Sequence, residues 1–145
     1  MLPSDVNPGR RLLVDTMVVS WLGRRSGPFL AWQEVVRDRD VFISFATYAE
    51  VVTGGRRAGW GDRTLDEWRG RLRSYTVIPG TVAIAESFAL LASRFRDQMS
   101  EADLWIAATA IGQPEPLPLG TADGGFERIA AEFPLVIVRP ERAAS

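Results

Sequence analysis

The chain has 145 residues, a formal net charge of −1 and a hydrophobic content of 46%, as expected of one ordinary globular domain over residues 1–145. Histidine, cysteine and lysine are absent, so all 17 basic residues are arginine. These absences exclude disulfides, thiolate metal sites and most of the side chains that serve as nucleophiles or general bases. Carboxylates remain as the main reactive groups.

The expected location follows from apolar content and from the first residues. No apolar run approaches the roughly 20 residues that a membrane-spanning helix requires. The N-terminal sequence Met1–Asp5 has neither the basic nor the apolar segment of a signal peptide. We therefore expect a cytoplasmic protein without a membrane partner.

Apolar runs typical of buried strands alternate along the chain with segments whose apolar residues recur at helical spacing. Strands are expected at 12–14, 41–43, 75–78, 117–119 and 135–138. Helices are expected at 16–22, closed by Gly23; from Pro28 to about 37; at 47–57; after a cap at Asp62; at 81–96; from a cap at Ser100 to 111; and from Asp123 to 131. Strands separated by helices predict a parallel sheet with right-handed crossovers, and therefore an α/β fold.

Four acids follow predicted strands or lie in the first turns of predicted helices: Asp15, Glu50, Asp103 and Asp123. Each has an ordinary structural interpretation. Asp15 and Asp123 are good helix N-caps, whereas Glu50 and Asp103 stand three residues after Thr47 and Ser100, in the capping-box pattern. In combination they indicate a site, because strand ends and a buried helix start bring acids to one edge of a sheet.

Several converging carboxylates usually indicate a hard divalent cation, and hence metal-assisted hydrolysis of a phosphate ester. The residues that other classes of α/β enzyme require are missing from this sequence. The chain has no lysine for a phosphate-binding loop and no G-x-G-x-x-G for a dinucleotide. Met17 stands where a phosphoaspartate phosphatase would carry its second acid. A nuclease is the chemistry that these observations favour.

Segments 13–19 (LVDTMVV), 43–54 (ISFATYAEVVTG), 102–110 (ADLWIAATA) and 119–126 (LGTADGGF) occur in the order and at the intervals of one family's motifs. With them the chain resembles a PIN-domain ribonuclease, specifically a VapC-like toxin of a VapBC toxin–antitoxin module. The resemblance implies a three-layer α/β/α fold around a central parallel sheet of four to five strands. It also implies an endoribonuclease that requires Mg²⁺ or Mn²⁺.

The resemblance assigns roles to individual residues of this sequence. Asp15, Glu50, Asp103 and Asp123 would form the catalytic acidic quartet. Asp15 and Asp103 would be the main metal ligands, and the other two acids would complete the site directly or through bound waters. The residues implied to support these acids are Thr16, Ser44 and Thr121.

Two positions depart from the family pattern, since Met17 replaces an asparagine and Gly125 stands where another acid is common. The implied partners are an RNA substrate, a VapB-like antitoxin and a second copy of the chain. Two alternatives stay open. One is a catalytically weak PIN domain that acts as a binding module, which Met17 favours, and the other is a PIN nuclease of RNA processing or DNA repair outside any toxin–antitoxin system.

The middle of the chain carries further candidates for binding. Arg56 and Arg57 could contact an RNA backbone, although a solvated helical face is the more ordinary interpretation. Trp60 and Trp68 could belong to the core or line a groove for an antitoxin helix.

Overall fold

A computed structural model of the protein describes residues 8–141, so the N-terminal residues behind the signal-peptide expectation lie outside the described range. Within it, one parallel sheet has the strand order β3-β2-β1-β4-β5. The strands are β1 (Arg11–Val14), β2 (Asp40–Ser44), β3 (Thr76–Ile78), β4 (Leu119–Gly120) and β5 (Ile137–Val138). Leu13 pairs with Phe42 on one side and Leu119 on the other, so β1 is the central strand.

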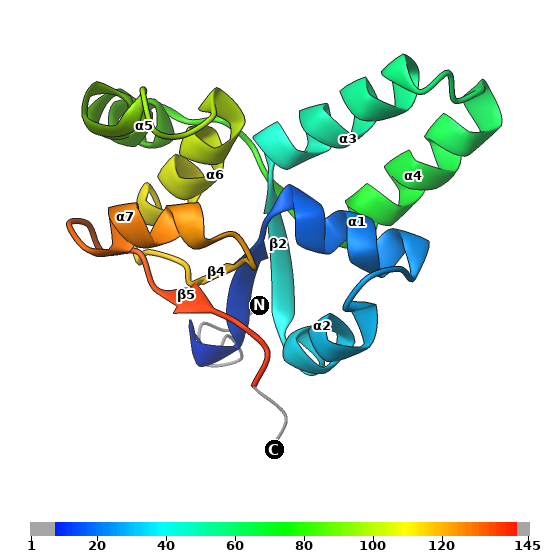
Figure 1. The fold of residues 1–145 in the computed structure, drawn as a ribbon, viewed down its shortest axis with the longest axis horizontal. Helices are drawn as coiled ribbons and strands as arrows, with labels where there is room; N and C mark the ends of the chain where they lie inside the picture. The colour runs from blue at the N-terminus through cyan, green and yellow to red at the C-terminus, as the bar shows by residue number, and fades with distance from the viewer. Residues whose placement is uncertain (1–7, 142–145) are drawn as a thin grey trace.

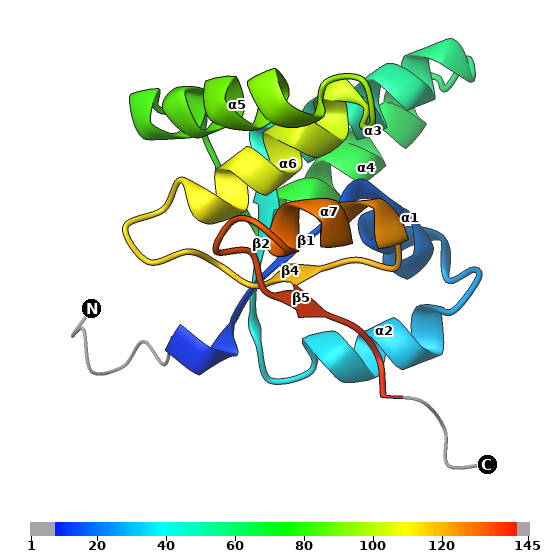
Figure 2. The same cartoon turned by 60° about the vertical axis from the view of Figure 1, so that its left-hand side comes forward.

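The helices form layers on both faces of this sheet (Figure 1). They are α1 (Thr16–Arg24), α2 (Phe29–Val36), α3 (Phe45–Arg57), α4 (Asp62–Ser74), α5 (Val82–Phe95), α6 (Glu101–Ile111) and α7 (Glu127–Ala130). Helices α5, α6 and α7 lie on one side, and Figure 2 shows α5 crossing the outside of α6. On the other side lie α1, α2 and α4, while α3 contacts both α1 and α6.

Two hydrophobic clusters hold the layers together, and β1 contributes alternately to both. Leu12 and Val14 pack in the cluster that contains Trp32 of α2. Leu13 points the other way, into the cluster that contains Ile106 of α6. All of these side chains are at most 1% exposed. The predicted three-layer α/β/α fold with a parallel sheet is thus confirmed.

Some predicted ends are wrong. Helix α1 continues through Gly23 to Arg24. Gly23 is needed for packing, since a Cβ there would lie 2.4 Å from the indole of Trp68. Strand β4 begins at Leu119, because Pro118 lacks the N–H that a ladder requires and offers only its carbonyl, to the N–H of Leu13.

Helix starts also differ from prediction. Helix α3 begins at Phe45 rather than Thr47, because the Ser44 hydroxyl accepts a hydrogen bond from the N–H of Ala46 and caps the helix there. Gly61 is the N-cap of α4, and Asp62 is the first residue inside the helix. An acid at that position is favourable through its interaction with the positive end of the helix dipole.

The two tryptophans of the α3–α4 region belong to the core rather than to an open groove. Trp68 is 9% exposed and stacks on the half-buried Trp60, with ring centroids 5.5 Å apart. Gly55 allows this approach, because a Cβ there would lie 2.2 Å from Trp60.

The described helices were also tested for membrane spans. None within residues 8–141 combines the length and the apolar character needed to cross a bilayer.

Candidate active site

The sheet reverses its winding direction at β1, which is where open α/β sheets bind ligands. The chain leaves β1 to add β2 and β3 on one side, then crosses to add β4 and β5 on the other. Asp15 follows the end of β1, and Thr121 follows the end of β4. These two residues, far apart in sequence, therefore meet at the carboxyl edge of the sheet.

Asp15 is buried, with 4% of its surface exposed. Its Oδ1 accepts a hydrogen bond from the N–H of Val18 at 3.0 Å, so it is the N-cap of α1, as one interpretation predicts. Its Oδ2 accepts a bond from the Thr121 hydroxyl at 2.5 Å. Both oxygens are thus fixed from opposite sides, which orients the carboxylate more strongly than capping alone.

Glu50 lies in the second turn of α3, half-buried. Its Oε1 accepts a bond from the Thr16 hydroxyl at 2.5 Å, and that hydroxyl also lies 3.1 Å from the hydroxyl of the buried Thr47. Since the helix begins at Phe45, the capping-box interpretation of Glu50 is wrong. The contact with Thr16 connects this carboxylate to the first residue of α1 instead.

Asp103 lies in the first turn of α6, where its N–H donates to the Ser100 hydroxyl at 3.1 Å. The predicted serine cap is therefore present, and it places the acid at the mouth of a buried helix. Residues 106–110 of this helix are all buried, as its apolar sequence predicts.

Asp123 is exposed and caps the short 3-10 helix Gly124–Phe126. Its Oδ1 accepts from the N–H of Gly125 at 2.8 Å, and its own N–H donates to the Thr121 hydroxyl at 3.0 Å. Thr121 thereby joins Asp15 and Asp123 through one hydroxyl. A Cβ on Gly125 would lie only 3.2 Å from the Asp123 carboxylate oxygen, so glycine leaves this acid unobstructed.

All four predicted acids line one hollow of about 580 Å³. Burial raises the pKa of Asp15, and the nearby Asp103 and Asp123 raise it further, against the hydrogen bonds from Thr121 and Val18. Burial likewise raises the pKa of Asp103, with Asp123 and Glu50 adding to the effect and Ser100 opposing it. The acids therefore repel one another across the hollow, a repulsion that a bound cation would relieve.

The four acids of this hollow offer carboxylate oxygens, which are the ligands that hard cations such as Mg²⁺ bind. The residues present therefore fit such a cation in their chemistry. The convergence is incomplete, however. Within residues 8–141, no group of three or more Asp, Glu, His or Cys side chains is arranged so that it could hold a metal ion. The acids thus share a hollow without converging on a common point.

The supporting residues suggested by the sequence divide into two groups. Thr16 and Thr121 contact the acids directly. Ser44 does not: its hydroxyl caps α3 and lies 2.8 Å from the hydroxyl of buried Thr109. Ser20 and Trp21 line the hollow and were missed, although their spacing from Thr16 and Met17 places them on the same face of α1.

Comparison with known proteins is consistent with this arrangement. The sequence model of the PIN domain family matches residues 12–132. A comparison with curated proteins found no match.

Several solved structures share the fold. A chain of the DNA-bound VapBC complex from Salmonella typhimurium is similar with a TM-score of 0.72 and 18% identity, covering 89% of this chain and 97% of that one. A chain of VapBC-1 from nontypeable Haemophilus influenzae has a TM-score of 0.69 and 21% identity, and the match covers 89% of this chain and 97% of that one. A chain of FitAcB from Neisseria gonorrhoeae has a TM-score of 0.66 and 24% identity, and the match covers 87% of this chain and 95% of that one. At these identities the likeness is one of fold.

Proposed function

The chain belongs to the PIN-domain family, and from that premise we propose that it is an endoribonuclease that requires Mg²⁺ or Mn²⁺ and serves as the toxin of a VapBC-type pair. The observation that carries this proposal is the hollow lined by Asp15, Glu50, Asp103 and Asp123. The chain has no histidine, cysteine or lysine that could supply another mechanism. We propose a single PIN domain over residues 1–145, acting in the cytoplasm.

The ion would be held by Asp15 and Asp103, with Glu50 and Asp123 completing its surroundings directly or through water. When bound, such an ion lowers the pKa of a coordinated water and neutralises charge on a phosphate. The protein's own part is orientation. The Thr121 hydroxyl orients Asp15, and the Thr16 hydroxyl orients Glu50.

A VapB-like antitoxin is the partner that we propose. The support is that the similar structures include VapBC complexes and a toxin–antitoxin complex from Klebsiella pneumoniae.

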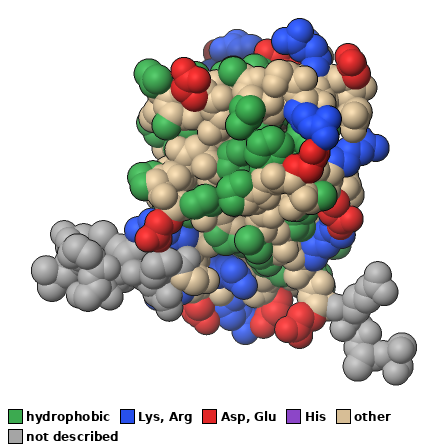
Figure 3. All heavy atoms as spheres, turned by 90° about the vertical axis from the view of Figure 1, so that its left-hand side faces the viewer, with side chains coloured by type: hydrophobic (Ala, Val, Ile, Leu, Met, Phe, Trp, Pro, Cys, Tyr) green, Lys and Arg blue, Asp and Glu red, His purple; other side chains and the backbone are tan. Residues whose placement is uncertain are grey.

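A second copy of the chain is the other proposed protein partner, and α5 offers a surface for it. Val82 and Leu90 on this helix are 79% and 55% exposed. Figure 3 shows hydrophobic side chains gathered on the face that carries α5 and α6. Replacing Leu90 with glutamate would place a charge in such an interface. We expect a dimer for the parent and a monomer for Leu90→Glu in sedimentation equilibrium; a monomeric parent would contradict the proposal.

One specific observation favours the alternative of a weak enzyme that acts as a binding module. Met17 lines the acidic hollow and is 56% exposed, yet its thioether is at best a weak hydrogen-bond acceptor. A PIN nuclease outside any toxin–antitoxin system shares the same chemistry, and a small DNA-binding protein encoded next to this chain would argue against it.

The deciding experiment expresses the chain alone, with Asp15→Asn as its matched inactive form, and sequences newly formed RNA ends. We expect cleavage by the parent only, abolished by EDTA and restored by Mn²⁺. Cleavage that persists in chelator and leaves cyclic phosphate ends would instead indicate attack by the ribose 2′-hydroxyl, and the proposal would be wrong.

A further inference from the structure

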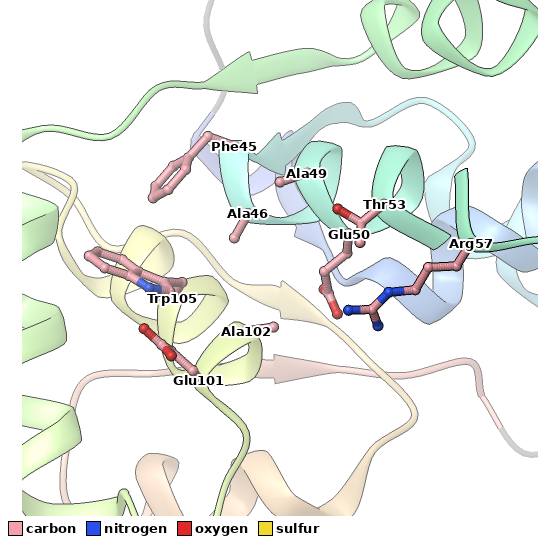
Figure 4. A pocket seen from close by; sticks show the side chains of 9 residues that line it. All are labelled: Phe45, Ala46, Ala49, Glu50, Thr53, Arg57, Glu101, Ala102 and Trp105. Carbon is pink, nitrogen blue, oxygen red and sulfur yellow. The ribbon is translucent and has the colours of Figure 1, made fainter. Parts of the chain in front are cut away.

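A second hollow, of about 470 Å³, lies between α3 and the first turn of α6 (Figure 4). Its size is within the range of about 300–1,000 Å³ typical of small-molecule sites. Glu50 lines both this hollow and the acidic one. Asp103 faces the acidic hollow, whereas Ala102 and Trp105 of the same helix face this one. The two hollows are therefore neighbours that share Glu50.

The α3 wall of this second hollow is a single helix face. Ala46, Ala49, Thr53 and Arg57 follow one another at intervals of three or four residues, as the helical repeat requires. The alanines leave space, and Ala102 on α6 does the same from the opposite wall. The result is an open trough with aromatic rings at one end and Arg57 at the other, and the carboxylates of Glu50 and Glu101 also line it.

Aromatic rings form one end of the trough. Phe45 meets Trp105 edge to face, with ring centroids 5.5 Å apart, and Phe88 stacks on Trp105 at 3.7 Å. Both Phe45 and Trp105 are half-buried and line the trough. The stacked phenylalanine covers one face of the indole and holds it in place, and Trp105 still lines the trough.

Arg57 forms the other end, and it is exposed. Among the described residues it takes part in no ion pair or side-chain hydrogen bond. Its neighbour Arg56 is also exposed but does not line the trough. Of the two arginines, Arg57 is thus the one whose guanidinium is placed to bind an anion beside the acids.

We propose that this trough binds the nucleotide next to the scissile phosphate of a single-stranded RNA, with its base against Trp105 and Phe45 and a phosphate on Arg57. This inference rests on the proposed ribonuclease function and adds a substrate subsite to it. Unpaired bases stack on aromatic side chains, and the planar guanidinium matches a phosphate. The position beside Glu50 lets one strand reach both hollows.

The test uses the full chain carrying Asp103→Asn, so that RNA binds without being cut. The probe is a single-stranded oligoribonucleotide with 2-aminopurine at each position around the cleavage site in turn. Stacking on Trp105 should quench the fluorescence at one flanking position. Adding Trp105→Leu should remove the quench and weaken binding about tenfold, whereas Trp105→Phe should keep most of the affinity.

Arg57→Ala provides an independent arm, because this exposed side chain has no role in the core. We expect affinity to fall about tenfold and the slope of log affinity against log salt to decrease by about 0.7, as for one lost phosphate contact on a single strand. Arg56→Ala, on the same helix but outside the trough, is the matched control and should change both quantities far less. Melting temperatures check that every variant is folded.

The outcomes distinguish a failure of the proposed subsite from a failure of the proposed ribonuclease function. A parent chain that cleaves RNA, with Trp105→Leu and Arg57→Ala cleaving and binding equally well, would overturn the subsite and leave the ribonuclease intact. Variants that retain RNA affinity but lose the dimer or an antitoxin would show a protein contact and would also overturn it. A parent chain that cleaves no RNA with Mn²⁺ would contradict the ribonuclease proposal itself.

Discussion

The two hollows on either side of the first turn of α6 are built in different ways. In the acidic hollow, Asp15 is 4% exposed and fixed through both of its oxygens. In the trough, Arg57 is exposed, and three alanines, Ala46, Ala49 and Ala102, are among the residues that line it. Burying a carboxylate among other acids costs stability but fixes its geometry, whereas an open trough costs little. We therefore expect activity to depend steeply on the first hollow and gradually on the second.

Asp103→Asn should have the largest effect, because it removes a proposed metal ligand. We expect cleavage to fall by more than about 100-fold, beyond the range typical of lost outer-shell contacts. Mn²⁺ affinity, measured by calorimetry, should fall with it. The control is Asp62→Asn, an acid in the first turn of α4 that lines neither hollow. Unchanged metal affinity in Asp103→Asn would remove this residue from the site.

Thr121→Val comes next, since it removes the hydroxyl that orients Asp15 and accepts from the N–H of Asp123. We expect activity to fall about 10- to 100-fold. Loss of the donor also raises the pKa of Asp15 further, because that hydrogen bond favours the ionised form. The acidic limb of the pH–rate profile should therefore move to higher pH.

Thr109→Val is the matched control for that change, because Thr109 is also fully buried and also makes hydroxyl hydrogen bonds. Both variants should lose about 1–3 kcal/mol of unfolding free energy in urea titrations. Only Thr121→Val should shift the pH profile. If the pH profile shifts in both variants, or in neither of them, Thr121 has only a structural role.

Asp15→Asn tests the stability cost of the acidic hollow. Because burial and neighbouring acids raise the folded-state pKa of Asp15 above 3.8, stability is lost as pH rises from that value through the folded pKa. Asparagine caps helices equally well. In chelator, the variant should therefore melt a few degrees above the parent at pH 7 and lose this advantage below about pH 3.8. Melting below the parent at pH 7 would show that Asp15 is mainly a structural cap.

Met17→Asn should have the smallest effect, with cleavage preserved or raised severalfold. The side chain is 56% exposed, so the fold should not suffer. An amide there can hydrogen-bond a carboxylate or a bound water. Single-turnover rates at saturating Mg²⁺ provide the measurement. Reduced activity in a folded variant would show that methionine packs productively at the rim.

The fold was largely predictable from the sequence, because the elements near the site have strong local patterns. Strand β1 is a short apolar run before an acid, and α6 has a serine cap and an apolar sequence on all sides. The wrongly predicted helix ends occur where a residue distant in sequence determines the local structure. Gly23 looks like a helix stop, yet its role is set by Trp68 across α1 and α4.

The site was predictable only in part, for the same reason. Motifs identified the four acids and Thr121, but not that one hydroxyl joins Asp15 to Asp123. Ser44 looked like a supporting residue and instead pairs with Thr109. The trough escaped detection altogether, because its walls come from α3 and α6 and only the fold brings them together.

The pairing of β1 with β4 has a consequence for how the protein is made. Asp15 is translated early, but the hydroxyl that orients it belongs to Thr121, which follows β4. Asp123 also follows that strand. A growing polypeptide therefore lacks an organised acidic hollow until β4 has left the ribosomal tunnel and paired with β1.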